Sequence, residues 1–261
     1  YPDWGEENLV NEGERDISWL LENDKDAPTI YMVLDPHDTK PWVMTWWAVY
    51  RNGRKVCFME WPDREQPMYH ETDHVAFGYD YYVELIRRKE RRLRVYRRII
   101  DERYGYKSVL SKGGLTSIAQ EIRKASNGEL RFIPSCGQEH DNRNLVQQAI
   151  LPRKVFSEAE KIITLEPTLL ADRNCRNFDY AMRHHVWKRN TGKALDTTTR
   201  FQQQVSDKNK CFPNTAEYFL GANPRWVEPG NWLLSEWETD EIRNLAGVGA
   251  NTGRRWGGYN T

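Results

Sequence analysis

Residues 29–35 read TIYMVLD, a continuous apolar run rich in β-branched residues that ends on an acid, Asp35. Such a run predicts a strand that is buried on both faces of a sheet. Residues 43–50 predict a second strand, and residues 51–54, RNGR, contain the Asn-Gly pair typical of a tight hairpin turn. Residues 55–60 predict the returning strand. The run at 29–35 is therefore expected to begin a three-stranded antiparallel unit.

Helices and further strands alternate after this hairpin. Residues 73–93 carry apolar side chains at helical spacing, and residues 95–100 predict a fourth strand that ends at Asp101. A fifth strand is expected at 130–134, and helices are expected at 115–125, 143–151, 169–188 and 213–221. The order strand, hairpin, helix, strand, helix, strand, helix is that of the α/β ribonuclease H-like fold, a mixed central sheet with helices on both faces.

The flanks of this pattern lack a clear period. We expect residues 1–28 to be a leader or linker, residues 29–221 to be the ribonuclease H-like domain, and residues 222–261, rich in Gly, Asn and Trp, to be a tail. No apolar stretch has the length of about 20 residues that spans a bilayer, so no membrane partner is expected. The four cysteines form no CxxC pair and the start of the sequence does not resemble a signal peptide, which favours reduced thiols inside a cell.

Bulk charge gives no indication of a nucleic-acid partner, because 38 basic residues balance 38 acidic ones. Locally, residues 87–98 hold eight Lys or Arg residues. Two interpretations stay open for this run: a solvated helix face with Glu84 and Glu90 interleaved, or a surface that contacts DNA phosphates. The DNA-binding candidates from the second interpretation are Arg87, Arg88, Arg91 and Arg92.

Asp35 and Asp101 are the main candidates for chemistry, because each ends a predicted strand. If those strands are neighbours, both carboxylates project from one edge of the sheet. Mg²⁺ and Mn²⁺ prefer such hard oxygen ligands, and two ions about 4 Å apart can cleave a phosphodiester. The alternative is that Asp35, before Pro36, is only a turn residue. Asp38 is either a further ligand, acting through water, or a solvated turn residue, and Glu60 either faces the same edge or is a surface glutamate.

Several ordered segments resemble the nuclease domain of the large terminase subunit of tailed double-stranded-DNA bacteriophages. They are residues 35–38 (DPHD) with Pro41, residues 60–62 (EWP), residues 96–105 (YRRIIDERYG), residues 130–134 (LRFIP) and residues 175–177 (CRN) with Tyr180 and Trp187. The resemblance covers about residues 29–221. It implies a ribonuclease H-like fold, a two-metal DNA endonuclease using Mg²⁺ or Mn²⁺, and metal ligation by Asp35 and Asp101.

One departure from that family lies at residues 208–218, KNKCFPNTAEY, where the resemblance implies a third acid. Lys210 and Asn214 stand at the two positions where the family has acids. Glu217, about one helical turn beyond Asn214, and Asp207 are the candidates to replace the missing ligand, with Glu217 slightly favoured for its longer side chain. Lys210 is expected either to put a cation where a metal would lie or to contact a DNA phosphate.

The resemblance also implies partners: double-stranded DNA, the viral portal or procapsid, and a terminase ATPase domain or small subunit, in the cytoplasm of a host cell. No GxxxxGK[ST] phosphate-binding loop occurs in the sequence, so the ATPase is expected on another part of a longer chain or on a separate protein. Two function hypotheses follow. The first is an endonuclease that cuts viral DNA during packaging, and the second is a weak or inactive module that binds DNA or the portal. A general resolvase or transposase-like nuclease is a more remote third.

Overall fold

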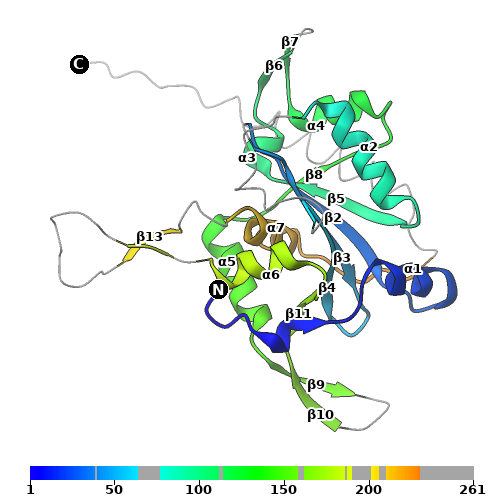
Figure 1. The fold of residues 1–261 in the computed structure, drawn as a ribbon, viewed down its shortest axis with the longest axis vertical. Helices are drawn as coiled ribbons and strands as arrows, with labels where there is room; N and C mark the ends of the chain where they lie inside the picture. The colour runs from blue at the N-terminus through cyan, green and yellow to red at the C-terminus, as the bar shows by residue number, and fades with distance from the viewer. Residues whose placement is uncertain are drawn as a thin grey trace, which may run out of the picture.

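The structure is a computed structural model that describes residues 1–38, 40–63, 77–111, 114–157, 162–185, 187–189, 201–205 and 210–229. Its centre is a seven-stranded mixed sheet (Figure 1), with strands in the order β1-β11-β4-β3-β2-β5-β8. Their bounds are β1 Leu9–Val10, β2 Thr29–Asp35, β3 Val43–Val49, β4 Lys55–Trp61, β5 Val95–Ile100, β8 Ile133–Pro134 and β11 Leu169–Asp172.

The antiparallel unit β2-β3-β4 and the parallel pair β2-β5 form the middle of this sheet. β2 pairs with β3 from Thr29↔Val49 to Asp35↔Val43, and it pairs in parallel with β5 up to Leu34↔Ile100. Every residue of β2 is buried, as the apolar run at 29–35 predicts. The turn between β3 and β4 has Gly53 at φ +88°, a backbone conformation that favours glycine. The first four predicted strands and the α/β ribonuclease H-like class are therefore confirmed, and the fifth predicted strand, at 130–134, is limited to Ile133–Pro134.

Alternating residues of β2 and β3 separate the core into two layers. Ile30, Met32 and Leu34 face α1 (Glu14–Asn23), α2 (Tyr79–Glu90) and α4 (Ile118–Ala125). Tyr31 and Val33 face α5 (Glu139–Ile150), α6 (Arg176–Arg183) and α7 (Cys211–Gly221). Helices therefore cover both faces of the sheet, which is why its central strands carry no polar alternation.

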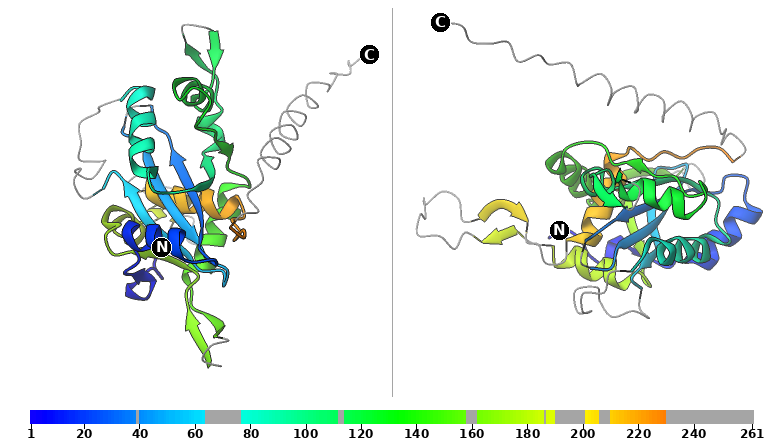
Figure 2. Two further views of the ribbon diagram at one scale, coloured as in Figure 1. Left: turned by 90° about the vertical axis from the view of Figure 1, so that its right-hand side faces the viewer. Right: turned by 90° about the horizontal axis from the view of Figure 1, so that it is seen from above.

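Three two-stranded hairpins lie outside the central sheet, and the sequence patterns predicted none of them. They are β6 (Val109–Ser111) with β7 (Gly114–Thr116), β9 (Arg153–Ser157) with β10 (Ile162–Glu166), and β12 (Trp187–Arg189) with β13 (Phe201–Val205). Figure 2 shows that they extend away from the body of the molecule in different directions. The β6-β7 hairpin follows α3 (Glu102–Gly105), the short helix directly after β5.

The structure corrects the expected leader at residues 1–28. Leu9 pairs with Ala171 and Val10 with Asp172, so β1 is an edge strand of the sheet. Ahead of it lies the short 3-10 helix η1 (Glu6–Asn8), and the side-chain amide of Asn8 donates to the carbonyls of Ile150 and Leu169. Backbone and side-chain hydrogen bonds therefore bind this segment to the domain.

Two further expectations change near the other end. Residues 169–188 were expected to be mostly helical, but Leu169–Asp172 is the buried strand β11, and α6 covers only Arg176–Arg183. The expected tail begins with residues that pack on β2. Thr29 Oγ1 and the backbone of Val227 exchange hydrogen bonds, as do Tyr31 Oη and the backbone of Arg225. Residues 230–261 lie outside the described part of the chain.

None of the helices in the described part of the chain is both long enough and apolar enough to cross a bilayer.

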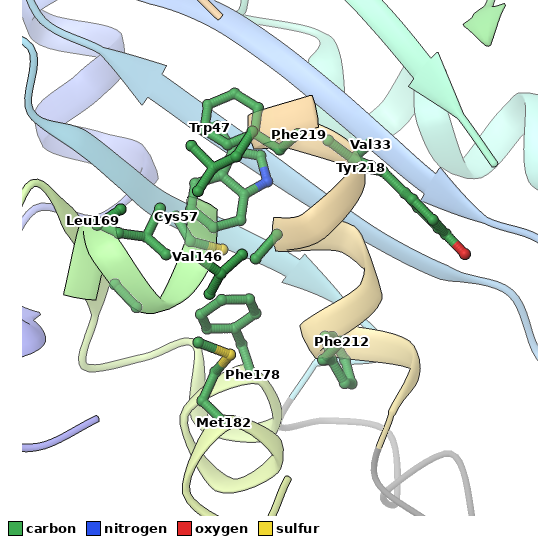
Figure 3. Packing of buried hydrophobic residues seen from close by; sticks show 14 of the residues in the cluster. Val33, Trp47, Cys57, Val146, Leu169, Phe178, Met182, Phe212, Tyr218 and Phe219 are labelled. Atoms are coloured by element: carbon green, nitrogen blue, oxygen red, sulfur yellow. The ribbon is translucent and has the colours of Figure 1, made fainter. Parts of the chain in front are cut away.

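Figure 3 shows the packing that fixes α7 on the sheet. Trp47 of β3 is fully buried and stacks on Phe219 of α7, with ring centroids 4.5 Å apart and an interplanar angle of 15°. Phe178 of α6 meets the edge of Trp47 at 5.4 Å. The ring of Trp47 therefore joins the sheet to both α6 and α7.

We expect Trp47→Ala to lower the free energy of unfolding by about 3–5 kcal/mol, because it removes a large side chain from a closely packed core. The matched control is Trp19→Ala on α1, whose side chain is 61% exposed and should change stability by less than about 0.5 kcal/mol. Urea unfolding followed by circular dichroism measures both. Equal effects of the two substitutions would contradict this account of the core.

Candidate active site at the ends of β2 and β5

Asp35 and Asp101 come together as the sequence analysis expected. Asp35 is the last residue of β2, and Asp101 directly follows β5, the parallel neighbour of β2. The backbone N–H of Asp101 donates to the carbonyl of Leu34 at 3.2 Å, which continues the strand pairing up to the two acids. Both carboxylates therefore lie at the same end of adjacent strands.

A local turn holds the Asp101 side chain. Its Oδ1 accepts the backbone N–H of Arg103 at 3.2 Å and its Oδ2 accepts that of Tyr104 at 3.3 Å, so Asp101 caps α3. Gly105 ends α3 against β5, where a Cβ would lie 2.6 Å from Cγ1 of Ile100. Only glycine fits this approach, and the close return of the chain fixes the turn that orients Asp101.

Helix α7 brings three side chains to the acid pair at intervals of four residues. Asn214 Nδ2 donates to Asp35 Oδ2 at 3.5 Å. The positive charge of Lys210 acts on Asp35, and Tyr218 lies near both acids, since its pKa responds to each of them. Residues four apart share a helix face, so Lys210, Asn214 and Tyr218 form one stripe. Lys210 and Asn214 were predicted from the sequence, whereas Tyr218 was not, although its four-residue spacing from Asn214 indicates the same helix face.

The electrostatics of the pair favour a bound cation. Asp35 is 8% exposed and Asp101 is 2% exposed. Burial, and then the negative charge of Asp101, raise the pKa of Asp35 to about 8. Burial also raises the pKa of Asp101, against the opposing effect of the Arg103 and Tyr104 backbone hydrogen bonds and the Arg103 charge. Two partly desolvated carboxylates that repel each other gain most from a divalent ion, and one or two carboxylates with water are the usual ligands of Mg²⁺. The donor set thus fits a divalent cation.

Two of the other predicted acids, Asp38 and Glu60, do not join this pair. Asp38 is exposed, and the described residues contain no group of three or more His, Cys, Asp or Glu side chains that could hold a metal ion. Glu60 is buried, and its two carboxylate oxygens accept the backbone N–H groups of Asn177 and Phe178 at the start of α6. Burial raises the pKa of Glu60 to about 8, and its position is that of a helix cap. Asp207 lies outside the described residues.

Glu217 does not have the position predicted for it beside Asp35. It is 1% exposed, and Oε1 accepts the hydroxyl of Tyr1 at 2.7 Å and Nε of Arg143 at 3.4 Å. His185 Nε2 lies 3.8 Å from the same oxygen. A buried carboxylate is stabilised only by such partners, and here they come from α5 and the segment before η1. Those contacts direct the Glu217 side chain away from the role of substitute ligand.

The basic run at 87–98 is divided between ion pairs and exposed side chains. Arg87 pairs with Glu84 at 2.6 Å and Glu129 at 2.8 Å, Lys89 pairs with Asp63, and Arg98 pairs with the buried Glu90. The exposed members are Arg88, Arg91, Arg92 and Arg94. They lie where α2 leads into the start of β5. At about 3.3 Å per residue, the six residues of β5 separate this end from Asp101 by roughly 20 Å. The predicted DNA-binding residues of α2 are therefore remote from the acid pair, whereas Lys210 is close to it.

The sequence matches no protein-family model and no curated protein. Among solved structures, the large terminase from the thermophilic bacteriophage D6E superposes with a TM-score of 0.54 at 14% identity, over 84% of this chain. The P22 large terminase nuclease domain superposes with a TM-score of 0.53 at 8% identity, over 87% of this chain and 93% of that one. This chain spans only 43% of the length of the D6E protein. The fold is therefore that of the terminase nuclease structures, as the resemblance implied.

We expect the repulsion at the acid pair to appear in the pH dependence of stability without metal. The pKa of Asp35 is about 8 in the folded protein and 3.8 for an ordinary Asp, so the unfolded chain loses this proton first. Stability should therefore fall as pH rises from about 4 to about 8, by about 1.4 kcal/mol for each unit by which the folded pKa exceeds the unfolded one.

Asp35→Asn removes this effect. In EDTA its thermal midpoint should exceed that of the wild type at pH 8, and the gap should close near pH 4. Asp38→Asn, a change in the same loop at an exposed position, is the matched control and should follow the wild type. A constant gap between Asp35→Asn and the wild type across this range would contradict the assignment of the raised pKa to Asp35.

Proposed function

We propose that this chain is a metal-dependent DNA endonuclease module that cuts double-stranded viral DNA during genome packaging. The observation that carries the proposal is the pair Asp35 and Asp101, buried side by side at the ends of parallel strands in a terminase nuclease fold. No base-reading element is needed, because positioning of a phosphodiester at a sheet edge depends on backbone contacts alone.

The residues of this chain divide the work as follows. A divalent ion, Mg²⁺ or Mn²⁺, would lower the pKa of a bound water and stabilise the charge that develops on the phosphate. Asp35 and Asp101 would hold that ion, and the α3 cap fixes the orientation of Asp101. The charge of Lys210 acts on Asp35, so we assign Lys210 to a phosphate oxygen of the strand being cut. Tyr218 adjoins the pair from the side of α7, because, after burial, both acids raise the pKa of its hydroxyl.

A second candidate function is a DNA-binding or portal-binding module without strong nuclease activity. The observation that favours it is Asn214, an amide where the terminase resemblance implies a carboxylate. In either case we propose that the chain acts with a terminase ATPase domain or small subunit, in the cytoplasm of an infected host cell. The length comparison supports the first of these partners, because this chain spans 43% of the D6E large terminase.

We expect the wild-type chain to nick or linearise supercoiled plasmid in Mn²⁺, and Asp35→Asn or Asp101→Asn to reduce the rate at least about a hundredfold. Asp26→Asn is the matched control, because the Asp26 side chain is 44% exposed and pairs with Arg51 at the turn between β3 and β4. Its rate should equal that of the wild type. Gel assays of initial rates measure all four proteins. Full activity in Asp35→Asn would exclude the nuclease site, and a wild type without activity would favour the binding module.

The DNA-binding role of the exposed α2 cations is a separate prediction. If Arg88, Arg91 and Arg92 each contact one phosphate, their joint replacement by Ala should reduce the slope of log affinity against log salt by about 2.7. Arg51→Ala serves as the control, because Arg51 is exposed and lies in the turn between β3 and β4. Fluorescence anisotropy with a labelled duplex measures the slope. An unchanged slope in the triple variant would show that these three side chains face solvent and do not contact DNA phosphates.

A further inference from the structure

Among the residues that the structure describes, the acid site contains fewer negative charges than a pair of divalent ions needs. In the described residues, its carboxylates are Asp35 and Asp101, and α7 adds the neutral amide of Asn214 and the ammonium of Lys210. Two divalent ions side by side carry four positive charges. At this site the two negative charges of Asp35 and Asp101 would have to balance those four positive charges and also the positive charge of the Lys210 ammonium. The same two carboxylates match one divalent ion closely.

We infer that the acid pair holds a single divalent cation, with the Lys210 ammonium occupying the electrostatic role of a second one and Asn214 marking the position where a carboxylate would create the second site. The inference rests on the proposed function and concerns only the number of ions and the residues that limit it. Lys210 and Asn214 are one helical turn apart on the stripe of α7 that faces the acids, so they act on the same side of Asp35.

The hydrogen bond between Asn214 and Asp35 supports this assignment. Nδ2 of Asn214 lies 3.5 Å from Asp35 Oδ2, so a carboxylate at residue 214 would stand directly beside that of Asp35. Two carboxylates at that separation are the geometry that bridges or flanks a cation. The Asn214 amide instead donates a hydrogen bond to the Asp35 carboxylate, so that oxygen has a partner without a second ion. Rotation of the amide would offer a neutral oxygen ligand but would add no charge.

The other acid of α7 is already engaged. Glu217 is buried against Tyr1 and Arg143 on the side of α5, so it supplies no charge to the acid pair. The lone pairs that Asp101 could offer to a metal ion are limited too, because each of its oxygens accepts one backbone N–H. Asp35 and Asp101 would hold a single ion without breaking the cap of α3.

Metal stoichiometry tests the inference directly. Isothermal titration calorimetry and manganese electron paramagnetic resonance are applied to the full 261-residue chain with Mn²⁺ alone. We expect one Mn²⁺ per wild-type chain, none for Asp35→Asn, and two for Asn214→Asp. Asn52→Asp is the matched control: it makes the same chemical change in the turn between β3 and β4, at the opposite end of the strands from Asp35, and should still bind one ion. Asp207→Asn should also bind one.

A second variant keeps the inference testable if Asn214→Asp folds poorly. Lys210→Ala removes the neighbouring positive charge and should tighten the first Mn²⁺ about tenfold without changing the stoichiometry. Circular dichroism checks the fold of each variant. Unchanged or weaker Mn²⁺ binding in Lys210→Ala would overturn the role given to that ammonium.

The possible failures separate the inference from the proposed function. Two Mn²⁺ ions on the wild type overturn the single-ion inference and leave the proposed nuclease intact. One ion on the wild type and one on a folded Asn214→Asp overturn the role assigned to Asn214. Absence of Mn²⁺ binding at millimolar concentration, together with absence of plasmid cleavage, overturns the proposed function and the inference with it.

Discussion

The parallel pairing of β2 with β5 is the constraint on which the rest of the molecule depends. Leu34 opposite Ile100 sets the register, and the hydrogen bond from Asp101 N–H to the Leu34 carbonyl extends it by one residue. A shift of one residue would turn every side chain of β2 to the other face and move Asp35 away from α7. Since both faces of β2 are buried, such a shift would also disrupt both core layers. The register of the site is thus protected by the whole core.

Helix α7 connects this register to the chemistry. Its Phe219 stacks on Trp47 of the sheet, while Lys210, Asn214 and Tyr218 face the acids. On another side, Glu217 forms a buried ion pair with Arg143 of α5. A substitution in the aromatic contact would therefore shift the side chains at the acid pair as well as lower stability. This coupling explains why a short helix at the end of the domain has nearly every residue buried.

The parts of the fold that the sequence predicted are those with strong local signals. Local patterns predicted the apolar strand at 29–35, the Asn52-Gly53 turn and the strand ending at Asp101. Because two of these strands end in acids, the same patterns predicted the acid pair. β11 was missed because its four residues, LLAD, carry no period, and its partner strand β4 lies more than a hundred residues away in the chain. Residues 1–28 were expected to be a leader or linker for a similar reason: β1 has two residues, and only Ala171 and Asp172 define it as a strand. The predicted position of Glu217 beside Asp35 was wrong, because helical spacing predicts which residues share a helix face. It does not predict the contact with Arg143 of α5, which attracts the Glu217 carboxylate.

The central sheet ends on both sides in strands of two residues, β1 and β8. An edge strand exposes unpaired backbone N–H and C=O groups that can recruit another chain, and very short edges leave few such groups. The strongly apolar seven-residue strands β2, β3 and β4 are the segments of the central sheet most prone to amyloid-like association, and all three are interior to it. Copies of this protein crowded together at high concentration would therefore have little opportunity to merge their central sheets, so that association between those sheets would have to proceed through side-chain surfaces instead.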